Sequence, residues 1–314
     1  MTDPTARILL VGFGRIAESH VAALNAVAGL ELVGAVDPGD TPARLYRGQP
    51  ITVYRDVAIA ITETAPDIVV IATPTWSHVR DCHEVLDLSP GGVLLVEKPL
   101  GGAVADALGL LARTRELETT LYVLYHLAFA PEVLWAIERL ERGDLGHVVG
   151  FTSQFFDPYV SDPDRALGSL TSSWLDSGVN ALSVLGRFIT IAYVEQLVED
   201  PQRFSTYRSR LAFSEPFGEQ HYGSLLTSWE CADRAQSTVL ALSEGHTLVM
   251  NHTAAVGSLE RNGEILELFT PDSAVARRDA HYLKLYQTLA AAGPSALDVV
   301  DTITMQRLLL TARE

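Results

Sequence analysis

The fold of the first part of the chain is decided by the stretch Ile8-Leu9-Leu10-Val11-Gly12-Phe13-Gly14-Arg15-Ile16-Ala17. It is an apolar run that ends at the pattern Gly-x-Gly-x-x-Ala, and a helix-forming segment, residues 16–26, follows. In such a turn the first glycine permits the tight bend, the second lets the backbone approach a pyrophosphate, and the alanine keeps the helix close to the sheet. The N–H groups at the helix start then face the phosphates. The stretch therefore predicts a strand–turn–helix unit that binds a dinucleotide.

An acidic residue stands where such a unit binds the adenosine ribose. A second apolar strand, residues 31–36, ends at Asp37, which lies 20 residues after Ala17. A carboxylate at this place accepts hydrogen bonds from the ribose hydroxyls and repels a 2′-phosphate. The pattern favours NAD as the cofactor, while Arg44 and Arg47 nearby keep NADP as the alternative.

The alternation of strands and helices continues to residue 125. Apolar runs at 68–72, 93–96 and 121–125 are separated by helical segments at 78–88 and 103–118. Repeated winding of this kind predicts a parallel sheet, and ligands bind beyond the carboxyl ends of its strands. Two polar turns fall at those ends. They are Thr73-Pro74, which is followed by His78, and Glu97-Lys98-Pro99.

The pattern changes after Tyr125. A helix is expected over 131–142, a strand over 147–156, a loop over 157–173 and a helix over 174–185, in which Asp176 and Asn180 share one face. Residues 189–269 are rich in alternating patterns, which predict antiparallel strands near 190–198, 203–213, 222–230, 236–243, 246–252 and 264–269. Residues 277–313 are mostly helical. We therefore predict an α/β protein with two domains, a Rossmann domain over 1–125 and an α+β domain with an open, mostly antiparallel sheet over 126–314. The C-terminal helices are expected to be able to pack back on the first domain.

Composition narrows the class of partner. The chain has 314 residues, 47% of them hydrophobic, and a net charge of −16, which argues against nucleic-acid or anionic-membrane partners. No apolar run approaches the ~18 residues of a membrane span. The start of the chain lacks the features of a signal peptide, and the chain has only two cysteines, so we expect a cytoplasmic protein without disulfides.

Several motifs in a fixed order resemble those of the Gfo/Idh/MocA family of oxidoreductases. The motifs are Gly12-Phe13-Gly14-Arg15-Ile16-Ala17, Ala72-Thr73-Pro74 with His78, Glu97-Lys98-Pro99, Phe129-Ala130-Pro131, Gly143-Asp144-Leu145-Gly146 and Asp176-Ser177-Gly178-Val179-Asn180. The resemblance implies hydride transfer between NAD(P) and a sugar, polyol or related carbinol. It also implies that Lys98 touches both cofactor and substrate. The expected cofactor-binding residues are Gly12, Phe13, Gly14, Arg15, Ile16, Asp37, Thr73, Pro74, His78, Glu97 and Lys98.

Two motifs depart from the family pattern. The Asp-x-Gly-x-His motif ends here in Asn180, and the Asn-x-Arg-Phe element is His126-Leu127-Ala128-Phe129. Both variants are similar to the aldose 1-dehydrogenase branch, which oxidises L-arabinose or D-galactose to the lactone. Against that branch, the loop 157–173 lacks a Trp- and Gly-rich run, and Asp37 indicates NAD where some members of the branch use NADP.

The roles of the catalytic candidates follow from their chemistry. An asparagine cannot accept a proton as a base, so Asn180 can only orient the substrate. Asp176 is then the expected general base, and Lys98 is expected to stabilise the developing alkoxide, although the two roles could be exchanged. His126, Asp157, Tyr159 and Trp174 are candidate substrate contacts. No metal is expected.

Other functions use the same residues. A reductase could run the reaction backwards on a ketosugar, and a non-catalytic NAD-binding sensor belongs to a different class, although the retention of Lys98 and Asp176 argues against it. We expect a homodimer or homotetramer that forms through the C-terminal sheet.

Overall fold

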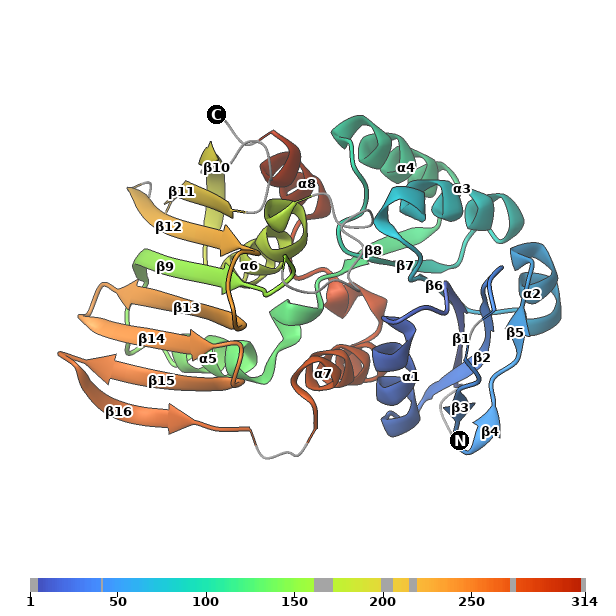
Figure 1. Cartoon of the computed structure of the whole chain (residues 1–314), viewed down its shortest axis with the longest axis horizontal. Coiled ribbons are helices and arrows are strands. Elements are labelled where there is room, and N and C mark those ends of the chain that lie inside the picture. Colours follow the sequence, from blue (N-terminus) through green and yellow to red (C-terminus); the bar gives the residue numbers. More distant parts are fainter. Residues whose placement is uncertain are drawn as a thin grey trace. The chain divides into compact units, whose positions relative to one another are not determined.

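The computed structural model describes residues 5–40, 42–160, 172–198, 206–214, 219–271 and 275–311, and it divides into two units (Figure 1). The first unit comprises Met1–Tyr125 and Arg278–Gln306, and the second comprises His126–Arg277 and Arg307–Glu314. Residues 278–306, which the sequence prediction assigned to the second domain, thus cluster with the first unit. None of the helices in the described ranges is long and apolar enough to cross a membrane.

The first unit is built on a six-stranded parallel sheet, which confirms the predicted fold class. Its strands lie in the order β5 (Val53–Tyr54), β2 (Leu30–Val36), β1 (Ala6–Val11), β6 (Ile68–Ile71), β7 (Val93–Glu97) and β8 (Thr120–Leu124). A short hairpin of β3 (Leu45–Tyr46) and β4 (Gln49–Pro50) follows β2 in the chain. The centres of β1, β6 and β7 are fully buried, which explains why these strands are continuous apolar runs in the sequence.

Helices cover both faces of this sheet. The connecting helices α2 (Val57–Thr64), α3 (His78–Leu88) and α4 (Val104–Glu116) lie on one face, and α1 (Ala17–Ala26) lies on the other beside α7 (Arg277–Ala292) (Figure 1). The chain then continues through the 3-10 turn η5 (Pro294–Leu297) into α8 (Thr302–Leu310). The face that α1 and α7 share is therefore assembled from the two ends of the chain.

The second unit contains an eight-stranded, mostly antiparallel sheet, as the sequence predicted. The strand order is β10 (Thr190–Val198), β11 (Thr206–Ser214), β12 (Gln220–Ser228), β9 (Val148–Phe156), β13 (Ala235–Leu242), β14 (His246–Asn251), β15 (Val256–Arg261) and β16 (Glu264–Phe269). Within the described part of this sheet, only β12 and β9 pair in parallel. Strand β15 was not predicted.

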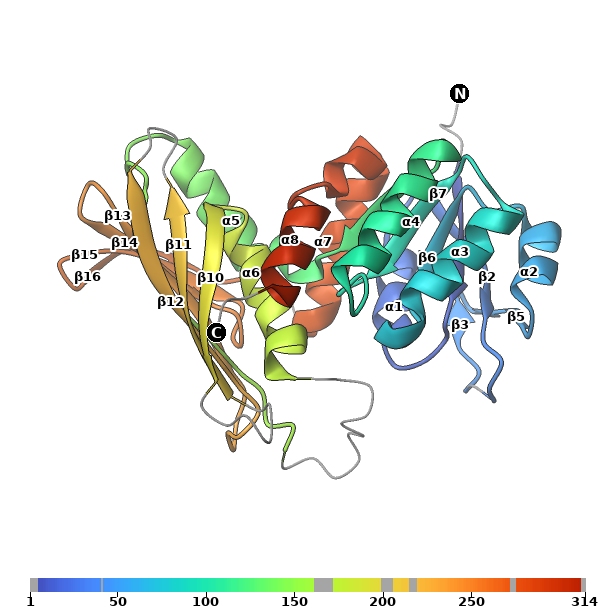
Figure 2. The ribbon, with the colours of Figure 1, turned by 90° about the horizontal axis from the view of Figure 1, so that it is seen from above.

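Helices cover one face of this sheet. Figure 2 shows α5 (Pro131–Glu141) and α6 (Val179–Leu185) on the same side, and no helix of the second unit's described residues lies on the other side. The short helix η2 (His126–Phe129) precedes α5. The predicted helix over 174–185 begins with a π-helical turn, Trp174–Gly178, and only then continues as α6.

Candidate active site

The glycine-rich turn after β1 has the geometry that its sequence predicts. Gly12 has φ +94°, and a Cβ there would lie 2.6 Å from the backbone of Ala72 and Thr73 at the end of β6. A Cβ at Gly14 would meet nothing within 4 Å, so a phosphate has room to approach the backbone. Ala17 is fully buried where α1 meets the sheet. The ring of Phe13 is also fully buried, which leaves only the backbone of that residue for a cofactor contact.

Asp37 braces this turn from the end of β2. One carboxylate oxygen accepts the N–H of Phe13 at 2.9 Å and the other accepts the N–H of Gly39 at 2.8 Å. A carboxylate has about four lone-pair positions, so both oxygens can still accept ribose hydroxyls. Asp37 therefore fixes the turn and remains suited to the ribose.

The arginines that follow Asp37 are engaged by internal acceptors. Arg44 donates to the carbonyl of Gly14, pairs with Glu18 at 3.3 Å and lies 4.4 Å from the ring centre of Phe13. The guanidinium of Arg55 pairs with Asp40 at 2.6 Å, and that of Arg47 donates to the carbonyls of Val27 and Leu30. Because these cations already have partners, they are poorly placed to compensate a 2′-phosphate, which agrees with NAD as the cofactor.

His78 joins the turn after β6 to the turn after β7. Its Nε2 lies 2.8 Å from the carbonyl oxygen of Thr73, and its Nδ1 lies 2.9 Å from the carbonyl oxygen of Pro99. The ring is buried, with 1% of its surface exposed. The hydroxyl of Thr73 donates to Asp81, one turn further along α3, at 2.6 Å. The sequence prediction made His78 a cofactor contact, whereas both of its ring nitrogens face carbonyls of the protein itself.

Glu97 is likewise occupied inside the first unit. Its Oε1 accepts the hydroxyl of Tyr282 at 2.5 Å and lies 3.1 Å from Nε2 of His20, whose Nδ1 faces the hydroxyl of Tyr286 at 2.7 Å. With the hydrogen on Nε2, His20 donates to Glu97 and accepts from Tyr286, so every group has a partner. The buried Glu97 thus ties β7 to α1 and α7, and this burial argues against the direct cofactor contact that the sequence suggested.

The pKa of Glu97 reflects this environment. Burial raises it, but the hydrogen bonds from His20 and Tyr282 and the charge of Lys98 together hold the pKa of Glu97 below its ordinary value. Burial and the charge of Glu97 raise the pKa of Tyr282 well above its ordinary value, so this phenol stays protonated and remains a donor. Glu97 is therefore an ionised carboxylate in the core of the first unit.

Lys98 is the one half-buried member of an otherwise buried turn. Of residues 97–101, which we call the Lys98 turn, the other four are buried and Lys98 is half-buried. The Lys98–Pro99 peptide is cis. The chain has 23 basic residues, but only Lys98 and Lys284 are lysines. One of two primary amines on side chains is thus presented at the carboxyl edge of the dinucleotide-binding sheet.

Asp176 and Asn180 lie in the second unit, on the π-helical turn Trp174–Gly178, which we call the Asp176 turn, and on the first turn of α6. Both residues are half-buried, whereas Ser177, Gly178 and Val179 between them are buried. The hydroxyl of Ser173 lies 3.0 Å from that of Thr227. π-Helical turns are rare and are frequent at functional sites. The turn thus presents the two predicted catalytic residues of this unit from a buried support.

Asp157 supplies part of that support. One carboxylate oxygen accepts the hydroxyl of Ser177 at 2.8 Å, the other accepts Nε of Arg234 at 2.7 Å, and the amide of Gln236 donates to both at 3.0 Å. Asp157 is 2% exposed. Its carboxylate is therefore used to hold the residue next to Asp176, and the burial argues against the predicted role as a sugar contact.

The other predicted substrate contacts are also buried. Trp174 donates from Nε1 to the carbonyl of Leu309 at 2.8 Å, and its ring packs where a Cβ on Gly178 would approach it to 2.8 Å. The ring of Tyr159 lies 5.7 Å from that of Trp229, and His126 is 9% exposed on η2. The burial of Trp174 and Tyr159 indicates packing and argues against substrate contact, and sequence reasoning could not separate the two roles.

Sequence reasoning also missed residues that surround these turns. Trp76, in the 3-10 turn η1 (Thr75–Ser77) that precedes α3, has 71% of its surface exposed next to the Thr73-Pro74 turn. Gln306 of α8 is buried, and with its amide oxygen turned toward the Lys98 turn it accepts the N–H groups of Leu100 and Gly101 at 3.0 Å each. Neither residue belongs to a recognisable motif, and the only available signal was a polar glutamine in an apolar helix.

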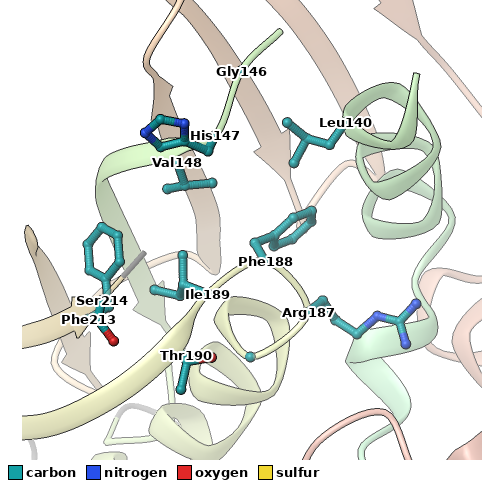
Figure 3. Close-up of a pocket in the computed structure, with 11 residues that line it drawn as sticks. Leu140, Gly146, His147, Val148, Arg187, Phe188, Ile189, Thr190, Phe213 and Ser214 are labelled. Carbon is teal, nitrogen blue, oxygen red and sulfur yellow. The ribbon is translucent and has the colours of Figure 1, made fainter. Parts of the chain in front are cut away.

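A separate cavity of about 640 Å³ lies in the second unit. Figure 3 shows the side chains of Leu140, Val148 and Phe188 gathered along it, while the side chain of Arg187 extends away from them. Burial lowers the pKa of Arg187, and the charge of Glu141 opposes this effect. The cavity is mainly apolar and contains none of the predicted site residues.

Within the described ranges, no cluster of three His, Cys, Asp or Glu side chains could hold a metal ion.

Known proteins resemble the chain in sequence and in fold. Residues 6–125 match the family model Gfo/Idh/MocA, described as an oxidoreductase family with an NAD-binding Rossmann fold. The rhizopine catabolism protein MocA of Rhizobium meliloti is 26% identical over 210 residues, which are 66% of this chain and 62% of MocA. The match thus spans less than two thirds of that relative.

Two solved structures show the same fold over nearly the whole chain. An oxidoreductase from Agrobacterium radiobacter, in complex with NAD+, L-tartaric acid and magnesium, has a TM-score of 0.78 at 13% identity, covering 98% of this chain and 95% of its own. The UDP-N-acetylglucosamine 3-dehydrogenase GnnA from Acidithiobacillus ferrooxidans has a TM-score of 0.71 at 16% identity, covering 98% and 95%. The glycine-rich turn and Asp37 lie within residues 6–125, and this part of the chain belongs to the NAD-binding Rossmann fold of the Gfo/Idh/MocA oxidoreductase family.

Proposed function

We propose that this NAD-binding oxidoreductase transfers hydride between the nicotinamide and a carbinol carbon of a sugar or polyol. The observation that carries the proposal is Lys98. It is one of only two lysines in the chain, and it is the one half-buried residue of an otherwise buried turn at the sheet edge expected to bind the dinucleotide. The names of the similar proteins, a rhizopine catabolism protein and a nucleotide-sugar dehydrogenase, support a sugar-like substrate.

In this mechanism NAD supplies the hydride acceptor, and the chain supplies binding and proton transfer. The turn at Gly12–Gly14 and the start of α1 would hold the pyrophosphate, and Asp37 would hold the adenosine ribose. The ammonium of Lys98 would donate a hydrogen bond to the substrate oxygen and stabilise the alkoxide that develops there. Asp176 would accept the hydroxyl proton, and Asn180 would orient the carbinol through its amide. The assignment of the base to Asp176 over Lys98 is part of the proposal.

A screen tests the reaction and its direction. The full-length protein is incubated with a panel of aldoses, polyols and ketosugars together with NAD, NADP or their reduced forms, and the absorbance of reduced nicotinamide is followed. We expect turnover of aldoses, with lactone as product, and a preference for NAD over NADP. Faster turnover of ketosugars with reduced cofactor would favour the reductase. Binding of NAD without turnover of any compound would favour the sensor and contradict the proposed dehydrogenase.

We also propose that the chain forms a homodimer or homotetramer through the face of the eight-stranded sheet that carries no helix in the described part (Figure 2). Polar and aromatic side chains such as Arg210 and Tyr222 are exposed on this face, with the guanidinium 3.8 Å from the ring centre. Light scattering coupled to gel filtration would measure the oligomeric state, and a monomer at all concentrations would contradict the assembly.

We further propose that the protein is cytoplasmic, and its two free cysteines fit that compartment.

A further inference from the structure

The backbone of the Lys98 turn is held from two sides by side chains that no motif would indicate. On one side, the buried ring of His78, at the start of α3, faces the carbonyl of Pro99 at 2.9 Å. On the other side, the buried amide oxygen of Gln306, in α8, accepts the N–H groups of Leu100 and Gly101 at 3.0 Å each. The turn is thus bonded through its peptide groups.

Each of these side chains also secures the turn to another part of the first unit. His78 faces the carbonyl of Thr73 at 2.8 Å with its second ring nitrogen. A neutral imidazole has one N–H and donates to one of these two carbonyls, and only the protonated ring donates to both. Gln306 lies in α8 and is 1% exposed, so no bulk water is at hand to replace its oxygen as the acceptor of the two N–H groups. Backbone N–H groups that lose a buried acceptor are costly to leave unpaired.

The consequence concerns the direction of Lys98. A lysine side chain has four rotatable bonds, and its position is set first by the backbone from which it starts. In the Lys98 turn that backbone is bonded just after Lys98, at residues 99, 100 and 101. The preceding residue, Glu97, is held through its side chain by His20 and Tyr282. A misplacement of about 1 Å at a reacting group can cost on the order of 10²-fold in rate.

We propose that His78 and Gln306 are positioning residues that hold the Lys98 turn so that the Lys98 ammonium faces the nicotinamide. This inference rests on the proposed function for the role of Lys98 in turnover, but it also makes a claim about the turn that can be measured without any substrate. It replaces the sequence-based interpretation of His78 as a direct cofactor contact.

The test compares three substitutions in the full-length protein. Gln306→Glu keeps an oxygen that can accept both N–H groups, Gln306→Met removes the acceptor at similar length, and Gln306→Asn withdraws it by one methylene. The first readout is amine labelling of Lys98 with an acylating reagent, followed by peptide mass spectrometry with and without NAD. Lys284, which is exposed on α7, is the internal control. The second readout is the dissociation constant for NAD, measured by calorimetry.

We expect NAD to slow the labelling of Lys98 in the wild type and in Gln306→Glu, and this protection to fall at least about five-fold in Gln306→Met and Gln306→Asn. The dissociation constant for NAD should stay within about three-fold in all of them, because the glycine-rich turn is intact. With a substrate from the screen, Gln306→Met should lower kcat by at least about ten-fold and Gln306→Glu should restore it.

Protection of Lys98 in Gln306→Met or Gln306→Asn equal to that in the wild type would overturn the proposal. Loss of NAD affinity and of the protection together, in all three variants, would also overturn it, because Gln306 would then serve only to fold the unit. A Lys98→Ala variant that retains full turnover would contradict the proposed function alone, since the labelling of Lys98 in the Gln306 variants does not depend on turnover.

Discussion

The Lys98 turn and the Asp176 turn present the two candidate catalytic groups in contrasting ways. The Lys98 turn is held mainly by its backbone, which is bonded to His78 and Gln306. The Asp176 turn is held mainly by side chains of its own and of the residue before it, since Trp174 donates to Leu309, Ser177 donates to Asp157 and the preceding Ser173 meets Thr227. Each turn presents a half-buried polar residue on a buried support.

The contrast teaches where each turn is sensitive to substitution. A turn held by its backbone depends on partner residues far away in the sequence, and in the Lys98 turn Glu97 is the one side chain whose bonds we expect to matter for stability. A turn held by its side chains depends on its own sequence, which limits the residues tolerated next to Asp176. The two supports also differ in the partner of their buried carboxylate. In the Lys98 turn, Glu97 lies beside His20, whereas beneath the Asp176 turn Asp157 pairs with Arg234.

Removing the presented groups gives the largest expected effect. Lys98→Ala and Asp176→Asn should each lower kcat by about 10²–10⁴-fold, because each removes a positioned group that interacts with the moving proton or the developing alkoxide. The dissociation constant for NAD should change only a few-fold. Steady-state kinetics and NAD titration measure both quantities, and full turnover in either variant would remove that residue from the mechanism.

The next effect concerns the buried carboxylate of the Lys98 turn. Glu97→Gln should lower the free energy of unfolding by about 3 kcal/mol at neutral pH, because it breaks a buried, hydrogen-bonded pair. The folded-state pKa of Glu97 is lowered, so its stabilisation is present above its ordinary value of 4.5 and is lost as the pH falls through the lower folded-state pKa. Thermal unfolding should therefore show a difference between wild type and variant that narrows below about pH 4.5. A difference that stays constant with pH would show that Glu97 is not ionised in the fold.

Substitution of Asp157, the buried carboxylate that supports the Asp176 turn, should have a smaller effect. Asp157→Asn removes the charge that faces Arg234, and we expect a loss of about 2 kcal/mol, discounted because the Arg234 side chain is 38% exposed. The matched control is Asp87→Asn, which removes the partner of Arg113 at a carboxylate that is 62% exposed and should change stability by less than about 1 kcal/mol. Urea unfolding compares the two variants, and equal losses would contradict a buried support.

The smallest effect is expected from one side-chain hydrogen bond of the Asp176 turn. Trp174→Phe keeps most of the ring but cannot donate to the carbonyl of Leu309, so it should lower the free energy of unfolding by about 1 kcal/mol. If Trp174 instead contacts substrate, the variant should raise KM at nearly unchanged stability. The two results can be distinguished by urea unfolding and steady-state kinetics.

The sequence predicted those parts of the molecule whose cause is local. The apolar runs of β1, β6 and β7 and the glycine-rich turn follow from periodicity and backbone preference, so the parallel sheet and the placement of Lys98 at its edge could be predicted. The π-helical turn could not, because it depends on the packing of the Trp174 ring against Gly178. Strand β15 was missed because Gly257 and Ser258 interrupt its apolar pattern.

The supports of the two turns could not be predicted at all. His20 and Tyr282 meet Glu97 across 77 and 185 residues, and Asp157 meets Gln236 across 79. No local pattern marks a residue as a partner at such separations, because the contact is created by the winding of the whole unit. For the same reason, burial changed the interpretation of Asp157, Trp174 and His78 from ligand contacts to internal partners.

The central claim is that the Lys98 amine faces the bound NAD. Acylation of the wild-type protein, followed by mass spectrometry of the peptides that contain Lys98 and Lys284, tests it without a substrate. We predict that saturating NAD slows the labelling of Lys98 at least about five-fold and leaves that of exposed Lys284 unchanged. Equal labelling rates of Lys98 with and without NAD, in protein shown to bind the cofactor, would contradict the account.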